Sequence, residues 1–88
     1  MKYSLELSPR AKNALDKLGS GDFARLDPAI LALANNPRPH GVKKLKEDIH
    51  RIRVGPWRVI YLVLDEERLV SVLEVVRRSK STYKRYPA

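Results

Sequence analysis

The sequence contains no cysteine, so neither disulfides nor thiolate metal ligands are available to it. It has only two histidines, His40 and His50, which do not make a metal site by themselves. No apolar run approaches the ~20 residues needed to span a bilayer. The first ten residues alternate polar and apolar side chains and lack the apolar core of a signal peptide. We therefore expect a cytoplasmic protein that uses no metal or other cofactor and contacts no membrane.

Acidic residues are scarce relative to basic ones: 10 Asp and Glu stand against 18 Lys and Arg, which gives a net charge of +8. Such a balance usually indicates an acidic partner, most often a nucleic acid, although a basic surface can also serve solubility alone. Clustering separates the two interpretations, because a binding patch concentrates its charge. After Glu74 the chain carries five cations and no acid, so its C-terminal end is a basic pole.

The chain is short, and its 88 residues predict one domain spanning residues 1–88. A domain of this size is only marginally stable by itself, so burial against a partner would help it.

Periodicity predicts an α+β fold with the order β-α-α-β-β-β, in which two helices pack on a mainly antiparallel sheet. Ser8 and Pro9 are typical of a helix start, and Gly19 of its end. A second helix is expected after Gly21. Asp27-Pro28 is either its N-cap pair or a kink within it, and we favour a helix whose regular part is Pro28–Ala34. The segment Val42–Asp48 is ambiguous between a short strand and a turn. The predicted strands are Tyr3–Leu7, Ile49–Val54, Trp57–Leu64 and Leu69–Val76.

Three arginines lie within eight residues around the turn Gly55-Pro56. If this turn is a two-residue loop, Arg53 lies opposite Arg58, and Arg51 lies opposite Ile60 on the same face. We expect the other face, with residues such as Ile52 and Val59, to pack on the helices. Like charges directly opposite one another destabilise a sheet, and no acidic residue is expected beside them. Exposed strand positions tolerate single arginines, but a bound polyanion explains this group better.

The end of the last strand brings a further arginine to this face. Pairing Asp65 with Arg68 places Arg77 there, and a one-residue change in the loop would place Arg78 there instead. The tyrosines Tyr83 and Tyr86 follow closely and can stack on bases, or can belong to a tail that packs back on the sheet.

These residues resemble the RelE/ParE superfamily of toxins from type II toxin–antitoxin systems, over essentially the whole chain. The most specific part is Arg-x-Arg-x-Gly-x-aromatic-Arg-x-x-Tyr, which runs from Arg51 to Tyr61. The basic central strands and the closing Arg-Arg-Ser followed by Tyr83 resemble the RelE branch more closely. The resemblance implies a single RelE-like domain that cleaves mRNA in the ribosomal A site without a metal. It also implies an antitoxin partner, and binding of operator DNA only through the toxin–antitoxin complex.

The resemblance also implies roles for individual residues. In this family a ribose 2′-OH attacks the adjacent phosphate, which requires a base, an acid and cations at the phosphate. By position, the candidate catalytic residues are Arg51, Arg53, Arg58, Arg78 and Tyr83. The cations expected to bind RNA are Lys44, Lys46, Arg77, Lys80 and Lys84.

The general base is the open question, because the first-strand positions are often lysine in the family and are arginine here. A guanidinium with a pKa above ~12 is a poor base at neutral pH. Tyr83 or a ribosomal group would have to take the proton, and His50 alternates onto the opposite face, where a structural role is expected. The alternatives are a ParE-like inhibitor of DNA gyrase and a catalytically weak member that mainly binds its antitoxin.

Overall fold

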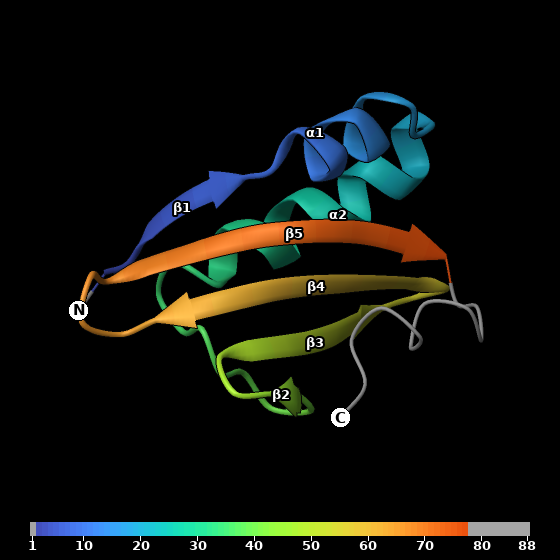
Figure 1. The fold of residues 1–88 in the computed structure, drawn as a ribbon. Helices are drawn as coiled ribbons and strands as arrows, with labels where there is room; N and C mark the ends of the chain where they lie inside the picture. The colour runs from blue at the N-terminus through green and yellow to red at the C-terminus, as the bar shows by residue number, and fades with distance from the viewer. Residues whose placement is uncertain (1, 78–88) are drawn as a thin grey trace.

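The computed structural model describes residues 2–77, which form a five-stranded sheet with two helices on one of its faces (Figure 1). In chain order the elements are β1 (Ser4–Leu7), α1 (Pro9–Asp16), α2 (Ser20–Ala32), β2 (Lys43–Lys46), β3 (Ile49–Val54), β4 (Trp57–Leu64) and β5 (Leu69–Arg77). The α+β class and the predicted order of elements are therefore confirmed. The ambiguous segment after the loop contributes a short strand, β2, so the sheet has one strand more than the sequence predicted.

The strand order in the sheet is β1-β5-β4-β3-β2. Neighbouring strands are antiparallel except for β1 and β5, which run parallel, and this confirms a mainly antiparallel sheet. The predicted bounds of β3 and β4 agree with the structure, because alternating apolar residues and the Gly55-Pro56 turn define them. The central strand is thus β4, with β5 and β3 on either side, and β1 and β2 lie at the two edges.

Helix α1 begins as predicted, because the Ser8 hydroxyl accepts a hydrogen bond from the Ala11 amide at 3.0 Å. Helix α2 begins at Ser20, and Pro28 lies inside it, so the favoured start at Pro28 is wrong and the alternative of a proline within the helix is confirmed. A proline inside a helix removes a hydrogen bond and crowds the preceding turn. Leu26 and Ile30, on either side of Pro28, are both buried in the core, and their packing outweighs this local cost.

One hydrophobic core joins the helices to the sheet. Ala11 and Leu15 of α1 and Leu26 and Ile30 of α2 belong to it, together with alternate residues of the three long strands. The strand residues of this core are Ile52, Val59, Tyr61, Val63, Val70, Val72 and Val75. The helices α1 and α2 therefore cover one face of the sheet.

A polar cluster ties three distant segments together at one end of the sheet. The Tyr3 hydroxyl donates to Asp65 Oδ1 at 2.6 Å, and Arg38 donates to both oxygens of Asp65, at 3.1 and 2.9 Å. The Arg38 guanidinium, followed by the Tyr3 hydroxyl, lowers the pKa of Asp65 from 3.8 to about 2. The cluster holds the loop around Arg38 against the turn between β4 and β5.

Replacing Asp65 with asparagine should reduce the loss of fold stability that occurs as the pH falls towards 2. The folded-state pKa of Asp65 lies below its ordinary value of 3.8, so the carboxylate stabilises the fold above about pH 4 and loses this effect towards pH 2. Asp65→Asn should therefore melt at a lower temperature than the parent at pH 7, with a difference that vanishes near pH 2. Thermal unfolding between pH 2 and 7 measures this. Glu66→Gln in the same turn is the control and should show the pH dependence of the parent. If Asp65→Asn also showed the pH dependence of the parent, the stabilising role of the Asp65 carboxylate would be contradicted.

Candidate functional site

The β3–β4 hairpin has the geometry that the sequence predicts. Gly55 has φ +59°, in the left-handed region that favours glycine, and Val54 pairs with Trp57 across the two-residue turn. Arg53 lies directly opposite Arg58, and Arg51 lies opposite Ile60. Side chains directly opposite one another in a ladder share a face, so the three arginines lie on the face away from the helices.

We call this surface the arginine face: the side of the sheet opposite the helices, with Arg51, Arg53 and Arg58. Arg53 is exposed, whereas Arg51 and Arg58 are only 6% and 4% exposed. Charged side chains are rarely buried to this extent unless they are paired. The arginine face thus combines two buried guanidinium groups with one that is open to solvent.

The arginine face also contains a buried carboxylate, that of Glu74, which sequence reasoning missed. Glu74 lies opposite Ile60, in the same row as Arg51, and is 2% exposed. Arg10 reaches it with a distance of 3.3 Å between Nη1 and Oε1. The expectation that no acidic residue neighbours the arginines is therefore wrong.

A β-bulge in β5 explains the error. Ile60 pairs with Glu74, but the next residue, Tyr61, pairs with Val72, so Leu73 is an extra residue in the ladder. One extra residue moves every later side chain of the strand to the other face. Without the bulge, Glu74 would point towards the helices.

The same bulge changes the position of Arg77. Arg77 pairs with Trp57, and its guanidinium carbon lies 4.9 Å from the centre of the Trp57 ring. Trp57 packs against the core on the helix-covered side, so Arg77 does not join the arginine face and the predicted register is wrong. The alternative that the sequence left open was Arg78, which lies outside the described residues.

The short strand β2 places its lysines on both faces. Lys44 pairs with His50, which lies on the opposite face from Arg51, so Lys44 does not join the arginine face. Lys46 pairs with Ile49 after a register shift, and Lys43 pairs directly with Arg51. Lys46 and Lys43 therefore extend the arginine face at the sheet edge, and the sequence had not identified Lys43.

His50 has the structural placement that its position predicted. Its ring stacks on Tyr61, with centroids 5.8 Å apart, and Nδ1 lies 2.9 Å from the Asp48 carbonyl oxygen. Burial raises the pKa of Tyr61 to about 12, and its hydroxyl donates to the Pro37 carbonyl at 2.7 Å. Both rings therefore belong to the packing of the hairpin against the preceding loop.

The remaining predicted site residues, Tyr83, Lys80 and Lys84, lie outside the described residues, as does Tyr86. Within residues 2–77, no three His, Asp or Glu side chains gather where they could hold a metal ion. In the same part of the chain, neither helix has the length and apolar character to cross a membrane.

Comparison with known proteins identifies the family. A family model described as the ParE toxin of type II toxin–antitoxin systems matches residues 5–82. The chain belongs to this family. It is also 30% identical over 83 residues to a protein of Methanocaldococcus jannaschii that carries the name RelE1 toxin, with 89% of this chain and 92% of that protein covered.

Solved structures of RelE toxins share the fold of this ParE-family chain. The RelE–RelB complex of Pyrococcus horikoshii matches with a TM-score of 0.83 and 26% identity, covering 91% of this chain and 99% of that chain. The intact RelBE complex of Escherichia coli matches with a TM-score of 0.76 and 26% identity, covering 89% of this chain and 99% of that chain. The resemblance to the RelE/ParE superfamily is thus confirmed, and the chain is a toxin of a RelBE-type toxin–antitoxin system.

Proposed function

We propose that this toxin is a metal-independent endoribonuclease that cleaves mRNA in the ribosomal A site and so inhibits translation. The observation that carries the proposal is the Arg53–Arg58 pair beside buried Arg51, on the sheet face away from α1 and α2. Guanidinium groups that lie opposite one another can both donate charge-assisted hydrogen bonds to a single phosphate. A ribosomal substrate also implies that the toxin acts in the cytoplasm.

The proposed chemistry is intramolecular transfer of the phosphate. The 2′-oxygen of one ribose forms a bond to phosphorus while the bond from phosphorus to the 5′-oxygen breaks, which leaves a 2′,3′-cyclic phosphate and a 5′-hydroxyl. One group accepts the 2′-OH proton and another gives a proton to the leaving oxygen. Arg58, with Arg51, Arg53 and Arg78, stabilises the negative charge that develops on the phosphate oxygens.

Proton transfer is assigned to groups other than the arginines. A guanidinium stays protonated at neutral pH, so we assign the 2′-OH proton to Tyr83 or to a ribosomal group. Orientation of the 2′-oxygen in line with the leaving oxygen supplies part of the rate. Basic side chains at the edge of the arginine face and beyond position the RNA backbone. At the edge these are Lys43 and Lys46. Lys80 and Lys84, outside the described residues, are assigned the same role, whereas Lys44 and Arg77 lie on the other face, where they would contact only RNA that extends past the sheet.

A substrate with a single 2′-deoxynucleotide tests this chemistry. Purified toxin should cut an mRNA on programmed ribosomes and leave a 2′,3′-cyclic phosphate, and a 2′-deoxy substitution at the cut position should abolish cleavage there. An mRNA with the 2′-deoxy substitution one nucleotide downstream is the control and should be cut normally. Cleavage that persists at the substituted position would contradict the mechanism.

The proposed partners follow from the same family. The related RelE chains were crystallised with RelB antitoxins, and we propose that a cognate antitoxin neutralises this toxin and that operator DNA is bound only by their complex.

The alternative function is inhibition of DNA gyrase, which the ParE description of the matching family favours. The arginine face distinguishes the two, because gyrase inhibition does not require a constellation of phosphate-binding side chains. The third candidate is a catalytically weak toxin that mainly binds its antitoxin. It is supported by Arg51 and Arg53, because arginine is a poor general base at positions where the family often has lysine.

A further inference from the structure

A row of side chains crosses the arginine face from β2 to β5. Lys43 of β2 pairs with Arg51 of β3. Ile60 of β4 pairs with Arg51 on one side and with Glu74 of β5 on the other. Because neighbouring strands lie about 4.8 Å apart, the row is roughly 14 Å wide. It begins with a cation at β2 and ends with a buried carboxylate at β5.

Arg10 brings a second cation to the β5 end of this row, although it belongs to α1. The ladder between β1 and β5 ends at Val72, so within residues 2–77 no strand pairs with the outer side of β5 beside Glu74. Helix α1 starts at this point, where the Ser8 hydroxyl donates to the Leu73 carbonyl at 2.6 Å. Arg10 lies in the first turn and reaches past the edge of β5, which places its Nη1 3.3 Å from Glu74 Oε1.

The Arg10 guanidinium is both anchored and accessible. Its partner Glu74 is buried, whereas the Arg10 side chain is 62% exposed. The contact with Glu74 uses Nη1, and a guanidinium carries five N–H donors, so Arg10 can hold Glu74 and donate to a phosphate at the same time. An anchored side chain also loses less conformational entropy when it binds. Arg10, Arg51 and Arg58 together outnumber the one carboxylate, so this part of the face attracts anions.

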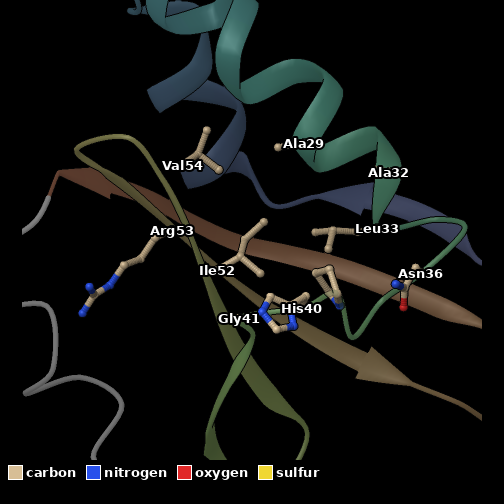
Figure 2. Close-up of a pocket in the computed structure, with 10 residues that line it drawn as sticks. Ala29, Ala32, Leu33, Asn36, His40, Gly41, Ile52, Arg53 and Val54 are labelled. Carbon is tan, nitrogen blue, oxygen red and sulfur yellow. The ribbon is translucent and has the colours of Figure 1, made fainter.

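We propose that Arg10 binds a phosphate of the mRNA, so that the RNA crosses the sheet from β2 to α1. The inference rests on the proposed nuclease function, in which the cut phosphate lies between Arg53 and Arg58. Lys43 lies on the β2 side of these arginines and Arg10 lies on the β5 side, so the two cations hold phosphates on opposite sides of the cut. Figure 2 shows the side chain of Arg53 extending away from the pocket between α2 and β3, so this RNA lies on the opposite face of the sheet from that pocket.

Binding of an uncleavable mRNA tests the proposal. The probe is an mRNA on programmed ribosomes with a 2′-deoxynucleotide at the cut position. Arg10→Ala should bind this complex about tenfold more weakly than the parent, because it loses a charge-assisted hydrogen bond to a phosphate. Lys12→Ala is the matched control, because Lys12 is an exposed cation on the opposite flank of the buried Ala11. It should bind within about twofold of the parent.

Neutral phosphate analogues locate the contact. A methylphosphonate removes the charge of one phosphate, and it is placed in turn at successive positions on each side of the cut. At one position it should weaken binding by the parent about tenfold and binding by Arg10→Ala less than about twofold, because the variant has already lost that contact. Lys43→Ala should lose its sensitivity at a position on the other side of the cut.

Two results would overturn the proposal. The first is binding by Arg10→Ala that equals binding by Lys12→Ala. The second is a set of losses from Arg10→Ala and the methylphosphonate that add at every position, since Arg10 would then act only through Glu74 and the fold. Arg10→Gln is the second variant, because its amide can still donate to Glu74 but carries no charge, and it should lose the same coupling without a lower melting temperature.

These results stand apart from a failure of the proposed function, because binding requires no cleavage. If the parent binds the ribosome-bound mRNA but does not cut the unsubstituted form, the nuclease function fails, and the coupling between Arg10 and one phosphate still decides this inference. If the parent cuts and Arg10→Ala binds as tightly as the parent, only the Arg10 contact fails.

Discussion

Replacing Arg58 with alanine is expected to slow mRNA cleavage on programmed ribosomes by about 10²–10³-fold. Arg58 lies opposite Arg53 and is only 4% exposed, so its guanidinium lies where most water is excluded. Loss of one such charge-stabilising donor costs a reaction roughly this factor. Single-turnover cleavage assays measure the change, and growth arrest on expression should be lost with it.

Two further variants separate the role of Arg58 in cleavage from its role in folding. Arg58→Lys keeps the positive charge but loses the planar fork, and it should still lose at least ~10-fold in rate. Lys12→Ala removes an exposed cation from α1, on the helix side of the sheet, and should leave cleavage unchanged. If Arg58→Ala melts like the parent and cleaves at the parental rate, Arg58 does not contact the reacting phosphate.

Replacing Glu74 with glutamine should destabilise the fold by about 2–3 kcal/mol. Glu74 is 2% exposed and shares the arginine face with buried Arg51 and Arg58, so its negative charge offsets theirs where water cannot. Removing one member of a buried ionic group leaves the remaining charge uncompensated, at a typical cost of about 3–5 kcal/mol. We reduce that range because Arg10, which binds Glu74, is 62% exposed and is screened by solvent.

Thermal unfolding measures this effect. In a domain of this size, a loss of about 2–3 kcal/mol lowers the melting temperature by roughly 10–20 °C. Glu67→Gln, on the exposed turn before β5, makes the same chemical change outside the arginine face and should melt within about 2 °C of the parent. A Glu74→Gln variant that melts like Glu67→Gln would mean that Glu74 does not balance the buried arginines.

The strands and the arginine face could be predicted because local signals determine them. Alternating apolar residues mark β3 and β4, and a two-residue Gly55-Pro56 turn permits only one close pairing of the strands that flank it. The positions of Arg51, Arg53 and Arg58 on one face follow from this pairing. The start of α1 could also be predicted from local sequence, because Ser8 and Pro9 alone are typical of a helix start.

The register of β5 could not be predicted in the same way. The extra residue at Leu73 is apolar like its neighbours, so no change of composition reveals the bulge. As a result, Arg77 was assigned to the wrong face, and no acidic residue was expected beside the arginines. The path of α2 through Pro28 also depends on tertiary packing, because only the buried positions of Leu26 and Ile30 show why the helix continues.

The central claim is that the arginine face cleaves mRNA on the ribosome, and mapping of cellular RNA ends tests it most directly. The 5′ ends of mRNA are sequenced after brief induction of the toxin, beside an Arg58→Ala culture, and gyrase–DNA breaks are counted in the same cells. We predict new 5′ ends within translated codons, in phase with the reading frame, that are absent from the Arg58→Ala culture. Intact mRNA together with accumulated gyrase–DNA breaks would contradict it and would assign the toxin to gyrase inhibition.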